Sequence, residues 1–127
     1  MKNNRWILFC TVVVACFLVF QPAKAQDPVK VAPKAFKEIL NNAHARVLEY
    51  HSKPGEKEGM HSHGACVVYV LSPGKFRSTT PDGKSTEIEY KAGDVVWRDA
   101  LTHSGENIGT TEFSTLLVEF KEVAKKK

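Results

Sequence analysis

The chain has 127 residues, too few for two ordinary domains, so we expect one hydrophobic core and one site. It carries 18 Lys and Arg against 14 Asp and Glu. Lys2, Arg5 and Lys24 lie in an N-terminal segment that we expect to be removed, which leaves a net charge of +1. A charge so close to zero gives no support for nucleic-acid binding.

Residues 1–25 have the three features of a secretory signal peptide. Basic residues precede an apolar run from Ile7 to Phe20, and Ala23-Lys24-Ala25 places small residues at both ends of a cleavage signature. The run has 14 residues, whereas a helix that spans a bilayer needs about 20. We therefore expect cleavage after Ala25, export to the periplasm or the cell exterior, and no stable membrane span after processing.

Two alternatives would keep the domain at a membrane surface. Val13-Val14-Ala15-Cys16 resembles a lipoprotein box, in which Cys16 would carry the lipid, although the apolar residues after it are not typical of such a site. In the other alternative the segment is not cleaved. Cys66 is the one cysteine after the segment, so the mature chain forms no internal disulfide.

The sequence after the signal peptide indicates a short leader and then an all-β domain. Gln26–Pro33 is polar with two prolines and is typical of a loose leader, whereas Ala35–Asn42 fits either one helical turn or a first edge strand. Short apolar or alternating runs then end at turn signals, which indicates about seven strands in a sandwich or small barrel. The clear runs cover residues 46–52, 67–71, 76–80, 86–90, 95–98 and 113–120.

Thr80-Pro81-Asp82-Gly83 is the strongest turn signal in the chain. Proline presets φ and glycine tolerates positive φ, so we expect a β-hairpin here. Near the C-terminus, Lys125–Lys127 form the densest basic run of the mature part. The predicted organisation is a signal peptide (1–25), a leader with the first edge segment (26–44), a β domain (45–121) and a solvated basic tail (122–127).

Three histidines suggest a metal site. His61 and His63 are two residues apart, and in a strand such residues point to the same face. His103 lies in a later segment of the same domain and supplies a third imidazole. The alternative is that all three are ordinary loop or turn histidines. His44 and His51 have no motif around them, and we expect neither to be a ligand.

These residues resemble the two conserved motifs of the cupin family. Gly55, His61-x-His63 and Gly74 resemble the first motif, and Gly93 with His103-x-x-x-Asn107 resembles the second. The similarity spans residues 46–120. It implies an all-β, double-stranded β-helix (jelly-roll-like) barrel in which His61, His63 and His103 bind one divalent metal. For Asn107 it implies hydrogen bonds within its loop and no metal contact.

The sequence departs from both motifs. A Glu usually follows the first motif by three or four residues, and here Val67 and Val68 stand there. The second usually reads Pro-x-Gly before its histidine, and here Asp99 and Leu101 stand there in a shorter loop. Without the carboxylate, three neutral imidazoles favour Fe²⁺, Ni²⁺, Cu²⁺ or Zn²⁺ over Mn²⁺. In one regular strand Val67 would face the lumen near the metal.

The resemblance leaves three functions open. The first is an exported small cupin that binds a divalent metal and acts on or binds a small anionic organic molecule, with the three-histidine dioxygenases of thiols, diketones and gentisate as the reaction class implied. The second is a non-enzymatic barrel for sensing, storage or delivery of a small molecule or metal. The third is a barrel that has lost its metal site and is kept for protein interaction.

Further residues are candidates for contact with the ligand. We expect Tyr69, Trp97 and Phe113 to pack the barrel, with one of them at the substrate mouth. Arg98 lies close to the segment that carries His103 and could orient an anion, although a surface position is the more common one for arginine. Our substrate-binding candidates are therefore Tyr69, Trp97 and Arg98. We expect Cys66 to be structural and to face away from the metal. Because the domain starts with an edge strand, it could pair as a homodimer.

Overall fold

The computed structural model describes residues 26–122 as one short helix and nine strands. The elements are α1 (Pro28–Val31), β1 (Phe36–Asn41), β2 (Ala45–Ser52), β3 (Lys57–His63), β4 (Cys66–Ser72), β5 (Gly74–Thr79), β6 (Ser85–Tyr90), β7 (Val95–Arg98), β8 (Leu101–Asn107) and β9 (Phe113–Phe120). The fold is nearly all-β, as the sequence predicts.

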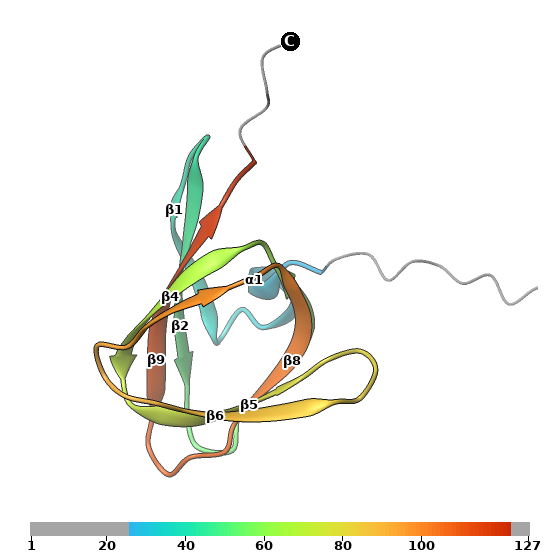
Figure 1. The fold of residues 1–127 in the computed structure, drawn as a ribbon, viewed down its shortest axis with the longest axis vertical. Helices are drawn as coiled ribbons and strands as arrows, with labels where there is room; N and C mark the ends of the chain where they lie inside the picture. Colours follow the sequence, from blue (N-terminus) through green and yellow to red (C-terminus); the bar gives the residue numbers. More distant parts are fainter. Residues whose placement is uncertain (1–25, 123–127) are drawn as a thin grey trace, which may run out of the picture.

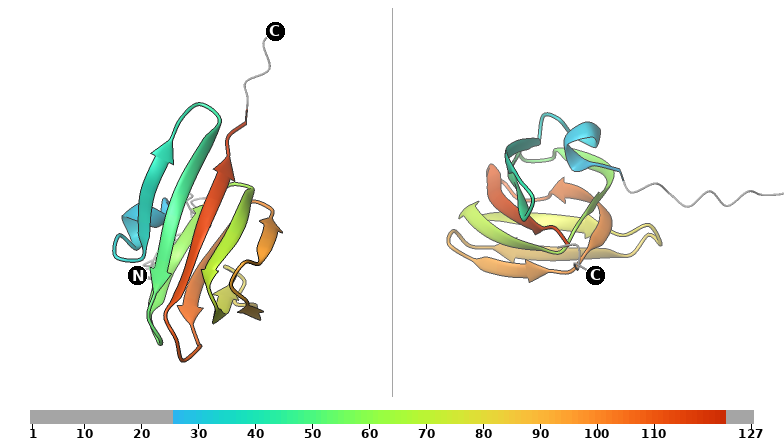
Figure 2. Two further views of the ribbon diagram at one scale, coloured as in Figure 1. Left: turned by 90° about the vertical axis from the view of Figure 1, so that its left-hand side faces the viewer. Right: turned by 90° about the horizontal axis from the view of Figure 1, so that it is seen from above.

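The strands form two antiparallel sheets that enclose a barrel (Figure 1). One sheet has five strands in the order β1-β2-β9-β4-β7, and the other has four in the order β3-β8-β5-β6. Figure 2 shows the five-stranded sheet face-on in its left view and the two sheets around the interior in its right view. Apart from the consecutive pairs β1-β2 and β5-β6, neighbours in each sheet are not consecutive in sequence, which is the topology of a double-stranded β-helix.

The six runs predicted from their apolar pattern are all strands, with ends that agree to within two residues. The predicted hairpin is also present. It joins β5 to β6, with Thr80 N donating to Lys84 O (2.9 Å) and Gly83 at a φ of 84°. Only glycine adopts this left-handed conformation without strain, which explains its place in the turn.

Three further strands complete the sheets. The segment that fitted either a helical turn or a strand is β1, at the edge of the five-stranded sheet. The other two, β3 and β8, are polar and contain glycine, so their composition gave no strand signal. They form because they pair with each other and because β8 also pairs with β5. His103 is therefore held in a strand and not in a loop.

The leader is packed, which corrects the expectation of a loose segment. Asp27 caps α1 by accepting a hydrogen bond from Val29 N (2.8 Å), and Pro28 is buried. Gln26 O accepts a hydrogen bond from Ser62 N (2.8 Å) on β3. The segment before β1 is therefore part of the domain and covers the strand that carries two of the histidines.

The side chains of β4 also point the opposite way from the prediction. Cys66, Val68 and Val70 point into the barrel, whereas Val67 is on the outer side. The prediction assumed one regular strand from His63 onward. In the structure β3 ends at His63 and a turn precedes β4, so the alternation of side chains starts anew.

The predicted signal peptide, the lipidation alternative at Cys16 and most of the basic tail (123–127) lie outside the described residues. Those parts of the domain prediction therefore stay predictions. Among residues 26–122, no helix is long and apolar enough to cross a membrane.

The core lies between the sheets, and Leu48 on β2 is at its centre with no exposed surface. We predict that Leu48→Ala lowers the free energy of unfolding by about 3 kcal/mol, because it removes buried methyl groups and leaves a cavity. The measurement is the midpoint of urea unfolding. Ile39→Ala is the control, because Ile39 is exposed on β1, and it should cost less than about 1 kcal/mol. Equal losses in the two variants would contradict this placement of the core.

Candidate metal centre

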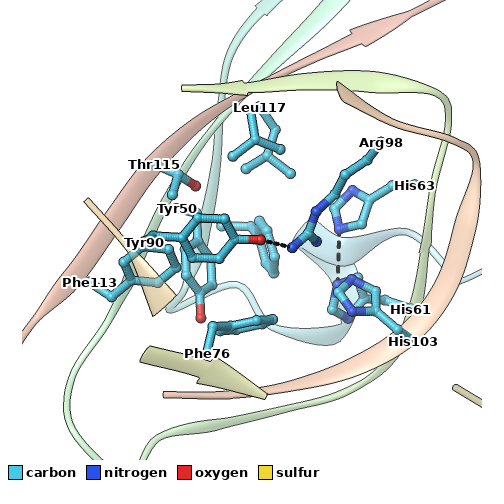
Figure 3. A pocket seen from close by; sticks show the side chains of 12 residues that line it. Tyr50, His61, His63, Phe76, Tyr90, Arg98, His103, Phe113, Thr115 and Leu117 are labelled. Carbon is cyan, nitrogen blue, oxygen red and sulfur yellow. Dashed lines mark hydrogen bonds between the residues drawn. The ribbon is translucent and has the colours of Figure 1, made fainter. Parts of the chain in front are cut away.

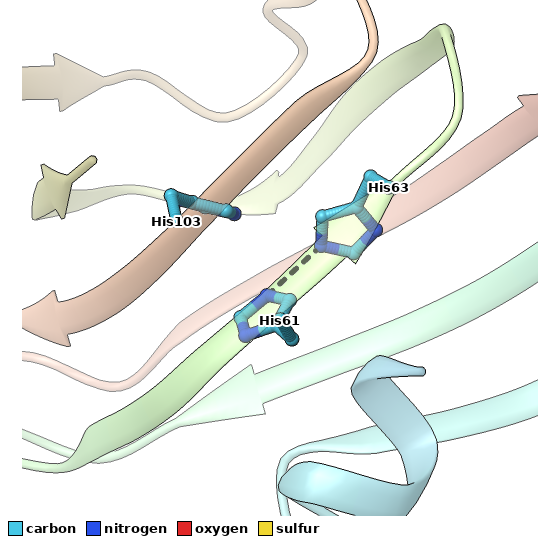
Figure 4. A group of neighbouring side chains, drawn as sticks. All are labelled: His61, His63 and His103. Carbon is cyan, nitrogen blue, oxygen red and sulfur yellow. Dashed lines mark hydrogen bonds between the residues drawn. The ribbon is translucent and has the colours of Figure 1, made fainter. Parts of the chain in front are cut away.

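Three buried histidines meet on the inner face of the four-stranded sheet (Figure 4). His61 and His63 alternate along β3 and point to the same side, as predicted. His103 is the direct partner of His61 across the β3–β8 pairing. The ring centroids lie 4.8–5.5 Å apart. Adjacent strands thus bring together residues that are 40 positions apart in the chain.

Each imidazole is held through its Nδ1 atom by a different group. His61 Nδ1 donates to the carbonyl oxygen of Gly59 (2.8 Å), and His63 Nδ1 donates to Glu119 Oε1 (2.7 Å). His103 Nδ1 shares a hydrogen bond with the Ser78 hydroxyl (2.8 Å). These partners come from β3, β9 and β5, and they leave the three Nε2 atoms directed toward one another. Such outer partners orient the imidazoles of metal sites.

The Nε2 atoms of His61 and His63 carry lone pairs that a positive ion would stabilise. A carbonyl and a carboxylate only accept hydrogen bonds, so neutral His61 and His63 have their proton on Nδ1 and none on Nε2. Their Nε2 atoms are nevertheless only 3.0 Å apart. His103 Nε2 is buried and has no hydrogen-bond partner among the described residues. The ligand atoms of all three lie within 4.8 Å of one another, so the cluster fits a divalent metal held by nitrogen.

Burial keeps His61 and His103 neutral. Burial lowers the pKa of His103 to about 3, and the positive charges of neighbouring histidines and of Arg98 add to the effect. Burial also lowers the pKa of His61, against the opposing pull of the Gly59 carbonyl. A neutral imidazole is the form that binds metal, so these two ligands are ready to bind at neutral pH.

A cavity opens beside the histidines and is lined mainly by aromatic rings (Figure 3). The space inside it that is open to the centres of water molecules is only about 30 Å³, enough for about two waters. Besides the three histidines, the lining comprises Phe36, Tyr50, Val68, Phe76, Tyr90, Arg98, Phe113, Thr115 and Leu117. Phe36 on β1 packs against both His61 and His63, so the edge strand closes one side of the site.

Arg98 is the cationic side chain of this cavity. It reaches inward from the end of β7 and donates a hydrogen bond to the Tyr90 hydroxyl (Figure 3). Its guanidinium carbon lies 5.9 Å from the centre of the Tyr90 ring. Among the described residues, no carboxylate is within ion-pair distance of it, whereas Arg46 and Arg77 each have two or more. Arg98 therefore brings an uncompensated positive charge to the cavity.

Comparison with known proteins gives structural matches only. No protein-family model and no curated protein matches the chain. A cupin domain from Bordetella pertussis Tohama I is 27% identical, with a TM-score of 0.63, covering 68% of this chain and 92% of that one. Two other structures resemble the fold alone. They are a double-stranded β-helix protein from Klebsiella pneumoniae (22% identical, TM-score 0.52, 69% and 84% covered) and an RmlC-like cupin from Methanocaldococcus jannaschii (17%, 0.54, 67% and 77%).

The chain has the cupin fold, and these matches support its membership of the cupin superfamily. The topology, the two histidine motifs and these matches agree on this point. In this cupin, Val68 is the inward residue beside the site where the family motif has a carboxylate, and Val67 is not. Glu119 on β9 also contacts the cluster, but it accepts a hydrogen bond from Nδ1 of His63 and does not face the Nε2 atoms.

The structure separates the predicted ligand-contact residues. Arg98 lines the cavity, but Tyr69 and Trp97 are 43% and 57% exposed on the outer face of the five-stranded sheet. Neither packs the barrel, because the alternation along β4 and β7 turns both outward. Phe113 does pack the interior and lines the cavity, as predicted.

The remaining predictions for single residues have mixed outcomes. Asn107 is fully buried, and its Nδ2 donates to Ser52 O (2.8 Å) and Thr111 O (2.9 Å), which confirms its role in hydrogen bonding. His44 and His51 are exposed and outside the cluster, as predicted. Cys66 is structural, but it faces inward and not away from the interior as we expected.

The sequence did not reveal Tyr90, Ser78 or Glu119. Tyr90 is the last residue of β6 and points inward. Its place at the end of a strand is the one feature of the sequence that could have indicated a position in the cavity wall. Ser78 and Glu119 contact histidines 25 and 56 positions away. No local pattern relates residues so far apart, so only the strand pairing identifies them.

We predict that Glu119→Gln weakens binding of Zn²⁺ or Ni²⁺ about 10-fold or more, because the carboxylate that orients His63 and makes it more basic is lost. His103→Ala should remove stoichiometric binding. The measurement is competitive titration of metal-free protein against a chelator. Glu112→Gln, at an exposed carboxylate, is the control and should keep the parent affinity. Full affinity in His103→Ala would contradict the three-histidine site.

Glu58, on β3 before His61, is buried and accepts a hydrogen bond from the Tyr50 hydroxyl. Burial raises its pKa from 4.5 to about 7. The folded protein therefore keeps a proton that the unfolded chain releases above about pH 4.5. The contribution of Glu58 to stability is complete below that pH and is lost as the pH rises through 7.

We therefore predict that the free energy of unfolding of metal-free protein falls relative to that of Glu58→Gln between pH 5 and 8. The slope is at most about 1.4 kcal/mol per pH unit. Urea unfolding at a series of pH values measures it, with Glu89→Gln as the exposed control. Parallel pH profiles for the parent and Glu58→Gln would show that Glu58 is ionised throughout this range.

Proposed function

We propose that this cupin binds one divalent transition metal through His61, His63 and His103, and binds a small organic anion beside it. The observation that carries the proposal is the set of three converging Nε2 atoms, each ring being fixed by a separate Nδ1 partner. A barrel that had lost its metal site would not need to keep a hydrogen-bond partner on each of the three Nδ1 atoms. Fe²⁺, Ni²⁺, Cu²⁺ and Zn²⁺ all suit this donor set.

The cavity supports an anionic ligand. Three neutral imidazoles do not compensate the charge of a divalent ion, and Arg98 adds a further positive charge on the same cavity. The position where cupins usually carry a Glu is occupied by Val68, so there is no fixed carboxylate there to repel an anion. The cavity volume of only about 30 Å³ limits the ligand to a few heavy atoms. Arg98 would hold the carboxylate of the ligand within the same cavity.

Oxidation of such a ligand by dioxygen is the reaction class that we propose for the site. A metal bound to the three histidines would hold the ligand and supply the redox chemistry. The aromatic walls formed by Phe36, Phe76 and Phe113 would exclude bulk water, and Arg98 would fix the orientation of the ligand. If the chain does not consume oxygen, the same site serves for sensing, storage or delivery of the anion.

We also propose that the domain works outside the cytoplasm. The support is the basic, apolar and small-residue pattern of residues 1–25. Mass spectrometry of the processed protein should find Gln26 at its N-terminus. A lipid on Cys16 would contradict release as a soluble protein.

The test of the proposed function compares two thiols on cobalt-loaded protein, whose absorption spectrum reports a new ligand. Mercaptoacetate carries a carboxylate, whereas 2-mercaptoethanol is neutral. We predict that Arg98→Met weakens mercaptoacetate binding about 10- to 100-fold, because a charge-assisted hydrogen bond is lost. Binding of 2-mercaptoethanol should change little. Oxygen uptake by iron-loaded protein with mercaptoacetate or a small diketone then tests the reaction class.

Lys75→Met is the matched control, because it removes a cation from the outer face of the four-stranded sheet. It should leave both affinities unchanged. Equal loss of both thiols in Arg98→Met would mean that Arg98 supports the fold and not the anion. If neither thiol changes the cobalt spectrum of the parent, the metal is closed to ligands and the proposed function is wrong.

A further inference from the structure

The two sheets have outer faces of opposite character. On the four-stranded sheet, Arg77 forms ion pairs with Glu87 (2.7 Å) and Glu106 (3.1 Å), and Lys75 also pairs with Glu87 (3.2 Å). An antiparallel sheet with one solvated face normally carries such polar residues on that face. The five-stranded sheet does not follow this pattern on its outer side.

Apolar residues cover the outer face of the five-stranded sheet. One row of paired residues crosses all five strands and consists of Leu40, Val47, Val118, Val67 and Trp97. The next row carries Leu116, Tyr69 and Val95 on β9, β4 and β7, while its charged members Lys37 and Glu49 are confined to β1 and β2. Leu71 and Phe120 extend the apolar surface. The outward positions of β4, β7 and β9 include no Lys or Arg. Figure 2 (left) looks onto this sheet, and α1 does not cover it.

One corner of this face, between the edge strand β7 and the end of β9, carries an ordered aromatic pair. The Trp97 and Phe120 rings stack with centroids 5.8 Å apart, although both residues are at least half exposed. The indole N–H of Trp97 donates to Asp99 Oδ1 (3.0 Å), so its one polar group is already satisfied within the chain. Fixed aromatic side chains lose little freedom on association and are typical anchors of protein interfaces.

We propose that this apolar face is the interface of a homodimer, with a second copy of the chain packed sheet against sheet. The exposed parts of Leu40, Tyr69, Leu71, Val95, Trp97 and Phe120 amount to roughly 600 Å², taking about half of ~200 Å² for each. With the valines and Leu116 between them, the face approaches the roughly 800 Å² per partner of a stable interface. A typical monomer exposes an apolar patch of at most about 300–600 Å².

A second copy fits this face better than other partners. The face is a sheet surface and not a groove, and sheets pack face to face as the two layers of a sandwich do. Surfaces that lie on membranes combine apolar residues with Lys and Arg, which the outward positions of β4, β7 and β9 lack. Without charges at its centre, the face can meet its own copy with no repulsion between like charges.

Sedimentation of the natively processed protein at about 1–100 µM tests the proposal. The expected result is a dimer for the parent and a dimer dissociation constant at least about 100-fold higher for Trp97→Lys and for Tyr69→Lys. The emission of Trp97 should shift to longer wavelength as the parent is diluted, because dissociation exposes the indole. Thr79→Lys, on the outer face of the four-stranded sheet, is the matched control and should remain dimeric.

Circular dichroism and the unfolding midpoint of each variant must match the parent, so that dissociation is not confused with unfolding. Tyr69→Phe serves where Tyr69→Lys fails to fold, and it should keep the dimer because the ring remains. A parent that is monomeric at 100 µM would overturn the proposal. So would a dimer that survives Trp97→Lys, or a monomer that binds lipid vesicles through this face.

Discussion

The structure depends on one constraint, which is that three imidazoles are fixed through their Nδ1 atoms and present their Nε2 lone pairs to each other. The Gly59 carbonyl and the Glu119 carboxylate can only accept hydrogen bonds, so they determine the tautomers of His61 and His63. The resulting contact of 3.0 Å between two Nε2 atoms is unfavourable unless a cation lies between them. A metal held at the proposed site would remove this repulsion and stabilise the interior.

The other strands of the barrel hold the three histidines in this arrangement. Strand β8 is poor in β-forming residues, yet it places His103 opposite His61 because it is paired on both sides. The edge strand β1 brings Phe36 against two of the rings, and the leader helix packs near the strand that carries them. Burial by these elements keeps His103 neutral, and Arg98 provides the one uncompensated charge that faces the cavity among the described residues.

The sequence was sufficient to predict the strands with apolar alternation, the hairpin at Gly83 and the three histidines. Each of these depends on a local pattern, and the period-two spacing of His61 and His63 is the clearest example. Predictions failed where the outcome depended on a break in the pattern or on pairing. A turn after His63 reversed the facing of Val67 and Cys66, and the outward orientation of Trp97 followed from the pairing of β7 with β4. Ser78 and Glu119 lie on distant strands and have no local signal.

X-ray absorption at the metal edge of the zinc- or nickel-loaded protein tests the central claim most directly. The account predicts one metal per chain with at least three nitrogen neighbours at roughly 2.0–2.1 Å, the imidazole scattering pattern and no sulfur, since Cys66 is not part of the cluster. His103→Ala should reduce the imidazole count by one. A first shell made only of oxygen, or one that is unchanged in His103→Ala, would contradict it.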